Sequence, residues 1–386
     1  MKFEIRAGEL ASAVAYAAAA ISSKPVKEVL AGMKITAAED GQVTFTGSDG
    51  DTIAAAQVAA NVMEPGTAVI PGGLFATVTK GLPAGDLAHL VTKDTEAILG
   101  YGRGEYALVT LDAGLYPGLP EPAAPAGKAA ADLLATAISR TAPVVSRDDD
   151  SLVEITAVQM ILDEDEITFS ATDRYRFMQA RLPWRPDAPV RDQRPALVPA
   201  RHLDALAKAV PSEHDVSVGV ADGIVTFAAP GRSLTCRLIT GEGFPSAGKQ
   251  LAPFASPSTT AVVSRRDLAE AVTRVAAIAD KNNPVHLDFT PGQVRVSADG
   301  GRGRGGEVLY ADLDGPDQTW PGFRPGYLRE ALEAAGTQTV AFAFTTPRRP
   351  VLITDGEQDE ARRDGSFSIV QMPQMPEAIA AMGAQS

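Results

Sequence analysis

The chain has 386 residues, 45% of them hydrophobic, which is enough for two to four domains with cores of their own. Its formal net charge of −13 excludes a uniformly basic nucleic-acid-binding protein, although not a locally basic face. The single cysteine excludes a disulfide framework, and the four histidines lack zinc-hydrolase spacing, so we predict no metal or cofactor. We also expect a cytoplasmic protein without a membrane partner, because the apolar run at residues 13–21 is shorter than a membrane span and follows acidic residues.

A fixed order of elements begins in the first third of the chain. The pattern predicts a helix over residues 8–21 and then two alternating strands over residues 33–49, which close on Asp49. A second helix is expected to begin at Pro71, where the missing N–H of proline costs nothing. The same order follows twice more. The second copy has a helix over 129–139, strands over 158–173 that close on Asp173 and a helix that begins at Pro199. The third has a helix over 264–279, strands over 285–299 that close on Asp299 and a helix that begins at Pro325.

Both landmarks recur at nearly the same interval. The closing aspartates are 124 and 126 residues apart, and the prolines are 128 and 126 residues apart. We therefore predict three tandem α+β domains over 1–121, 128–253 and 257–376, each with two helices packed on antiparallel sheets. A C-terminal tail over 377–386 follows, and residues 120–127 and 251–259 are expected to be linkers.

The six predicted helices differ in charge from the rest of the chain. They carry 13 Lys and Arg against 8 Asp and Glu, whereas the remainder is strongly acidic. A weakly positive helical surface suits a protein that stays near DNA without gripping its phosphates, since extensive phosphate neutralisation gives static, salt-sensitive binding. Ordinary exposed lysines and arginines on helices would give the same count.

Four features resemble chemical motifs. Residues 301–306 satisfy GxGxxG but lie between strand-like segments, whereas a dinucleotide site needs a following helix, so we expect an inter-strand loop. An enzyme that uses a nucleotide at this loop, between Gly301 and Gly306, is the alternative of another class. The acidic runs 148–150 and 163–166 are interpreted as solvated turns, and Cys236 as a small core residue.

Several segments then indicate a family. ATDRYRF (171–177), LVPAR (197–201), GYGRGEYALVTLDAGLYPGLP (100–120), FTTPRRPVLI (344–353) and Met372-Pro373 resemble the bacterial DNA polymerase III β sliding clamps over essentially the whole chain. The resemblance implies a non-enzymatic, head-to-tail homodimeric ring that encircles duplex DNA without reading its sequence. Such a ring tethers DNA polymerase III for processive replication and also binds the clamp loader and other peptides.

The resemblance also implies three sites. A pocket between the second and third domains would bind a short apolar peptide with a glutamine; its residues are Ile155, Thr172, Arg174, Tyr175, Arg176, Phe177, Pro245, Gln250, Pro350, Val370, Met372 and Pro373. The DNA-facing residues would be Lys24, Lys80, Arg140, Arg147, Arg201, Arg274 and Lys281. The dimer interface would join Tyr106 and Leu108 to Ile278.

Some positions depart from the family pattern. Gly72 and Gly73 replace residues that are usually basic, Gln374 and Met375 follow Met372-Pro373 where an arginine is usual, and the tail over 377–386 is extra. These differences lie mainly around the peptide pocket. They leave open a divergent second clamp copy, of the kind that protects some actinobacteria from antibiotic peptides that bind clamps.

Overall fold

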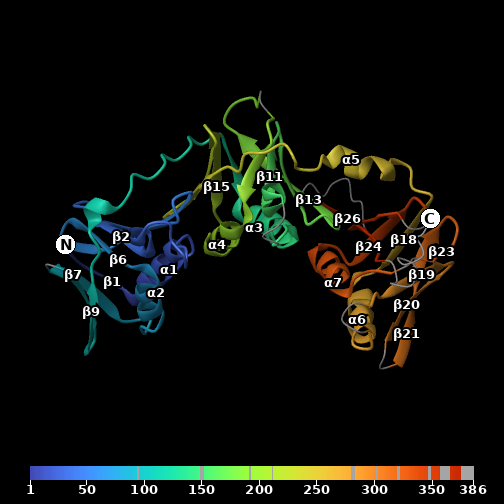
Figure 1. Ribbon diagram of the computed structural model, residues 1–386, viewed down its shortest axis with the longest axis horizontal. Helices are drawn as coiled ribbons and strands as arrows, with labels where there is room; N and C mark the ends of the chain where they lie inside the picture. The colour runs from blue at the N-terminus through green and yellow to red at the C-terminus, as the bar shows by residue number, and fades with distance from the viewer. Residues whose placement is uncertain are drawn as a thin grey trace. The chain divides into compact units, whose positions relative to one another are not determined.

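The computed structural model describes residues 1–93, 95–147, 152–190, 193–210, 212–279, 283–300, 303–319, 322–346, 349–356 and 366–374. Contacts group the chain into two compact units. Unit 1 consists of Met1–Ile138 with Trp184–Thr240, and unit 2 of Ser139–Pro183 with Gly241–Ser386. The three predicted hairpins, their flanking helices and the strands that follow them are found within these units (Figure 1).

Each predicted hairpin is present and antiparallel. In unit 1, β2 (Gly32–Ala37) pairs with β3 (Gln42–Ser48). In unit 2, β11 (Ala157–Leu162) pairs with β12 (Glu166–Thr172), and β19 (His286–Thr290) pairs with β20 (Gln293–Gly300). Buried and more exposed residues alternate in β19 and β20, as strands with one buried face require.

A third strand extends each hairpin, and the sequence predicted it only in the last repeat, where the segment after Gly306 is strand-like. These strands are β4 (Thr52–Ala59), β13 (Arg176–Pro186) and β21 (Gly303–Leu309), and each pairs with the strand before it. Each begins three or four residues after the closing aspartate. Asp49 and Asp173 therefore occupy equivalent tight turns, whereas Asp299 lies within β20 and pairs with Arg304.

The expected helices are confirmed with slightly different ends. The first helix of each repeat is α1 (Ala7–Ala18), α3 (Ala131–Thr141) or α6 (Arg265–Ala276). The helices at the prolines are α2 (Gly72–Lys80), α4 (Leu203–Ala209) after the 3₁₀ turn η5 (Ala200–His202), and α7 (Pro325–Ala334). Pro71 and Pro199 are the N-caps of α2 and η5, and Pro325 is the first residue of α7, as proline's fixed φ favours.

A three-stranded antiparallel meander follows each proline-initiated helix. The meanders are β7 (Leu87–Lys93), β8 (Glu96–Tyr101) and β9 (Gly104–Val109); β15 (Asp215–Ala221), β16 (Ile224–Ala229) and β17 (Arg232–Arg237); and β24 (Thr339–Phe344), β25 (Val351–Asp355) and β26 (Phe367–Gln371). The remaining strands are β1 (Lys2–Arg6), β5 (Asn61–Glu64), β6 (Gly66–Pro71), β10 (Gly127–Ala130), β14 (Ala196–Pro199), β18 (Thr259–Ser264), β22 (Ala311–Asp314) and β23 (Gln318–Thr319). Short helical turns are η1 (Glu28–Ala31), η2 (Ala113–Leu115), η3 (Ala142–Val144), η4 (Val153–Thr156), α5 (Ala247–Leu251) and η6 (Ala252–Ala255).

Two backbone ladders join strands of successive repeats. In unit 1, β17 pairs antiparallel with β4, with Cys236 opposite Thr52. In unit 2, β26 pairs antiparallel with β13, with Gln371 opposite Arg176. The last meander strand of one repeat therefore pairs with the third hairpin strand of the repeat before it. The equivalent strands β9 and β21 are instead edge strands of their sheets in the described part of the chain.

Close packing between helix and sheet shapes the cores. In unit 1, α1 lies beside α2 and packs on β3 and β4 (Figure 1). Gly47 allows this approach, because an added Cβ would lie 2.0 Å from the carbonyl oxygen of Ala17. Cys236 is completely buried, as predicted for a small core residue. No helix among the described residues is long and apolar enough to cross a membrane.

Candidate functional site

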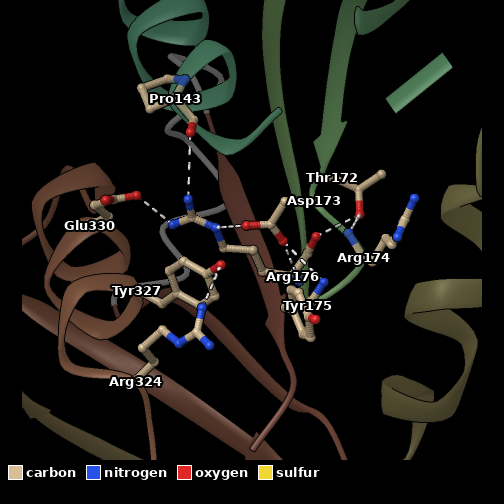
Figure 2. A network of polar contacts seen from close by, with 9 residues as sticks. All are labelled: Pro143, Thr172, Asp173, Arg174, Tyr175, Arg176, Arg324, Tyr327 and Glu330. Atoms are coloured by element: carbon tan, nitrogen blue, oxygen red, sulfur yellow. Dashed lines mark hydrogen bonds and ion pairs between the residues drawn. The ribbon is translucent and has the colours of Figure 1, made fainter. Parts of the chain in front are cut away.

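The turn between β12 and β13 is fixed by two side chains (Figure 2). Asp173 Oδ1 accepts hydrogen bonds from the backbone N–H groups of Tyr175 and Arg176, both at 3.0 Å. Thr172 Oγ1 donates to the carbonyl of Arg176 at 2.7 Å and accepts from the N–H of Arg174 at 3.2 Å. Four hydrogen bonds therefore define a turn of five residues.

Arg176 connects this turn to α7. Its side chain is only 5% exposed, and Nε donates to Asp173 Oδ2 at 3.0 Å while Nη1 donates to Glu330. The guanidinium also lies 4.1 Å from the ring centroid of Tyr327 (Figure 2). Burial, with the nearby charge of Asp173, raises the pKa of Tyr327, so its hydroxyl stays protonated. A buried arginine needs such partners, because its charge is costly to desolvate alone.

An apolar cluster lies beside this network in unit 2. Phe177 and Val370 face one another in the β13–β26 ladder and pack with Phe254. Half-buried side chains surround these three: Phe244, Ala247, Leu251, Ala343 and Leu352. We call the eight residues the Phe177 cluster.

Two large exposed side chains lie close to the Phe177 cluster. Tyr175 is 56% exposed and Met372 is 47% exposed. The N–H of Met372 donates to the carbonyl of Tyr175 at 2.8 Å, which holds the two side chains near each other. Apolar surface of this kind is a common feature of peptide-binding sites.

The twelve predicted pocket residues all belong to unit 2, but their exposure differs. Thr172, Arg176, Phe177, Val370 and Ile155 are buried, whereas Arg174, Tyr175 and Met372 are exposed and the other four are half-buried. The buried members lie beneath the surface that the exposed members form. Sequence reasoning missed Phe254, Leu251 and the α7 residues Tyr327 and Glu330. For Leu251 and Phe254 the available signal was the apolar content of residues 251–254, a segment that we predicted to be a linker.

A second buried aspartate occupies the equivalent turn of unit 1. Asp49 Oδ2 lies 2.7 Å from Arg201 Nη2 and 3.2 Å from His202 Nε2, and the Asp49 side chain is 7% exposed. Burial alone would raise the pKa of Asp49. The hydrogen bonds from His202 and from the backbone of Thr52 and Asp51, together with the charge of Arg201, outweigh burial and lower the pKa to about 2.

The third aspartate has no equivalent contacts. Asp299 is exposed and forms no side-chain ion pair with the residues the structure describes. Asp49 and Asp173 each have one partner from the start of a proline-initiated helix, Arg201 and Tyr327, which lie two residues after the proline. The corresponding residue after Pro71 is Gly73, and no atom lies within 4 Å of a Cβ added there.

The predicted DNA-facing residues fall into two groups. Lys24, Lys80 and Arg147 are exposed and form no ion pair within the described ranges, so their charges are available. Three others already have contacts within the chain. Arg201 pairs with Asp49, Arg274 donates two 2.8 Å hydrogen bonds to Glu307, and Arg140 is half-buried over the ring of Phe367. Lys281 lies outside the described residues. Burial of the guanidinium lowers the pKa of Arg140.

The predicted interface residues lie on or near the two edge strands. On β9, Tyr106 is exposed and stacks on Tyr101, whereas Leu108 is buried. Ile278 follows α6 and packs over β21, where a Cβ on Gly305 would lie 2.3 Å from its Cδ1. Exposed apolar side chains continue along both segments, with Val109 at 65% and Tyr310 at 77% exposed.

The glycine-rich segment is part of a β-hairpin. Gly300 pairs with Gly303 at the end of the β20–β21 ladder, and residues 301 and 302 lie outside the described residues. No helix N-terminus follows, so the arrangement that a dinucleotide phosphate needs is not formed. The described ranges contain no cluster of three metal-ligating side chains. Residues 148–150, the first acidic run, are outside them.

Comparison with known proteins identifies the family. Models of the N-terminal, central and C-terminal domains of the DNA polymerase III beta subunit match residues 1–120, 129–246 and 250–366. The chain is 32% identical to the beta sliding clamp of Streptomyces coelicolor, over 97% of this chain and 99% of that one. It is 30% identical to the beta sliding clamp homolog GriR of Streptomyces muensis, again over 97% and 99%.

Solved structures agree with this result. The sliding clamp of Bacillus subtilis superposes with a TM-score of 0.86 at 25% identity, over 97% of this chain and 99% of that one. The Pseudomonas aeruginosa clamp bound to griselimycin gives 0.86 at 21% identity, over 97% and 100%. Fold and matches together define a three-domain protein of the sliding clamp class. The chain belongs to the bacterial beta sliding clamp family. Members of this family are the processivity factors of DNA polymerase III, and their partners are DNA and the polymerase.

Proposed function

We propose that two copies of this chain form a head-to-tail ring around duplex DNA, and that the surface over the Phe177 cluster recruits DNA polymerase III, the clamp loader and other proteins through short apolar peptides. The ring holds DNA by enclosing it, so retention depends on closure rather than on many phosphate contacts. The single observation that carries the proposal is the repeated ladder between successive repeats.

The ladders predict how the copies join. β17 pairs with β4 and β26 pairs with β13, which leaves the equivalent strands β9 and β21 as edges. Exposed edge strands with apolar residues are templates for pairing with another chain. We therefore expect β9 of one copy to pair antiparallel with β21 of the other. Leu108 is equivalent to Cys236 and Gln371, whose partners Thr52 and Arg176 lie opposite the closing aspartates of their hairpins. Because Arg304 lies opposite Asp299, the same register brings Leu108 opposite Arg304 of the second copy.

The DNA-facing surface is proposed from the cations that remain free. Lys80 is the last residue of α2 and is exposed, and Lys24 follows α1. Arg201 is less suitable as a probe, because its pairing with Asp49 means that a substitution there also alters unit 1. Lys80→Glu should therefore weaken retention on DNA while leaving the fold unchanged, as expected for an exposed helical charge. Lys93→Glu, on an exposed lysine at the end of strand β7, is the matched control.

A loading experiment on circular DNA tests the proposal. The protein is loaded with a clamp loader on a nicked circle, which is then linearised, and the bound fraction is measured before and after. A ring slides off the ends, so the bound fraction should fall sharply after linearisation. Equal retention on circular and linear DNA, or a monomeric mass in sedimentation, would refute the enclosing ring.

The divergent-copy alternative remains a second candidate. It is favoured by the similar identities to a clamp of Streptomyces coelicolor, 32%, and to the homolog GriR, 30%. Griselimycin, the compound bound in the Pseudomonas aeruginosa structure, supplies the test. A specialised resistance copy should bind griselimycin at least tenfold more weakly than a housekeeping clamp of the same organism. Equal affinities would exclude that role.

A further inference from the structure

Arg174 has a backbone conformation that L-residues rarely adopt. Its φ is +78°, and Asp222, at +50°, is the other non-glycine residue with positive φ among the described residues. Aspartate tolerates this region because its short side chain forms local hydrogen bonds. A long unbranched side chain has no such compensation, so arginine at this position costs stability that glycine would not.

The turn itself does not require this arginine. Its geometry is fixed by the side chains of Thr172 and Asp173, which bond the backbone of residues 174–176. Only the N–H of Arg174 takes part, and any residue other than proline supplies that group. Glycine would therefore suit the turn better, and what arginine adds is its side chain.

The other arginines of the site are already engaged. Arg176 is buried between Asp173, Glu330 and the Tyr327 ring. Arg324 donates to the hydroxyl of Tyr327 at 3.2 Å and lies over the rings of Tyr175 and Tyr327, at 5.6 and 5.0 Å. The Arg174 side chain, in contrast, is exposed, points away from the Arg176 network (Figure 2), and forms no hydrogen bond or ion pair with the described residues.

Arg174 therefore presents an available guanidinium next to the exposed side chain of Tyr175. The backbone carbonyl of Tyr175 accepts a hydrogen bond from the N–H of Met372, whose side chain is also exposed. We propose that Arg174 is a specificity-determining residue of the partner site, and that it pairs with a carboxylate of a peptide whose apolar side chains cover Tyr175 and Met372. This inference rests on the proposed partner function. A guanidinium binds a carboxylate through two parallel hydrogen bonds, which selects acidic peptides over their amide equivalents.

Matched peptides test the charge directly. The probes are synthetic nine-residue peptides, amidated at the C-terminus, each with one glutamine and three large apolar residues. In a series of peptides an aspartate occupies each remaining position in turn, and each has a twin in which asparagine replaces that aspartate. One further peptide lacks aspartate and has a free C-terminus, which separates a side-chain carboxylate from a terminal one. At one position the aspartate peptide should bind roughly three- to tenfold more tightly than its twin, and added salt should reduce the difference.

The Arg174→Gly variant then separates charge from structure. It should abolish the aspartate preference while raising the melting temperature by a degree or two, because the positive φ is relieved. Asp222→Gly, at the other positive φ, should leave the preference unchanged. Equal affinities for every twin pair, with the apolar peptide still bound, would overturn the role of Arg174. If no peptide binds the wild-type protein, the proposed partner site itself fails.

Discussion

The buried carboxylate of Asp49 gives unit 1 a stability that depends on pH in a predictable way. Its pKa is lowered from 3.8 to about 2, and each pKa unit corresponds to about 1.4 kcal/mol, so the paired carboxylate contributes about 2 kcal/mol at neutral pH. Because the folded pKa is below the unfolded one, this contribution is fully present above about pH 5 and disappears as the pH falls through about 2. Asp49→Asn should remove it.

Hydrogen exchange in the full chain provides the assay. The amides of β4 and β17 report on unit 1, and the free energy of their opening is compared between wild type and variant at several pH values. The variant should be about 2 kcal/mol less stable at pH 7, and the difference should shrink as pH approaches 2. Asp51→Asn, at an exposed carboxylate on the same turn, is the control and should have little effect. A difference that is as large at pH 2 as at pH 7 would refute the electrostatic origin.

Four further predictions concern other parts of the chain. If the proposed head-to-tail dimer forms, Gly73→Arg should slow its subunit exchange severalfold by supplying a cation for Asp299 of the second copy, and adding Asp299→Asn should cancel the gain; an unchanged exchange rate would argue against this pairing. Gly47→Ala should lower stability by about 3 kcal/mol, measured by denaturation, because its Cβ would lie 2.0 Å from the Ala17 carbonyl oxygen. Cys236, whose pKa burial raises to about 12, should not react with thiol reagents at pH 8 until unit 1 opens, so fast labelling of native protein would contradict its burial. Met372→Asp should abolish binding of apolar peptides in a fluorescence assay, and wild-type affinity would show that the site lies elsewhere.

Local patterns were sufficient to predict the hairpins and helices. Alternation over residues 33–49 and the proline at residue 71 act over a few residues, so the sequence carries them directly. The ladders between repeats were missed because their two strands lie far apart along the chain. Arg176 opposite Gln371 is one example, since nothing near either residue indicates the ladder.

The site was predicted only through the family resemblance, and its energetics were not predicted at all. The sequence contains Asp49, Asp173 and Asp299 as three equivalent residues, yet two are engaged and one is exposed. Asp49 is paired with Arg201, two residues after a distant proline that only the folded chain brings near, whereas Asp173 is paired with Arg176 of its own turn. Likewise, the positive φ of Arg174 follows from four hydrogen bonds rather than from its own residue type.

The proline- and alanine-rich stretch after residue 120 is anchored along its length. The N–H of Ala123 donates to Thr226 Oγ1 at 2.9 Å, the N–H of Ala126 donates to Val218 at 2.8 Å, and the carbonyl of Ala124 comes so close to Gly219 that a Cβ there would lie 2.1 Å away. A protease should therefore find no easy cleavage point here, despite a composition that suggests a loose tether. Motion between the first and second repeats must instead bend the sheet that β4 and β17 share.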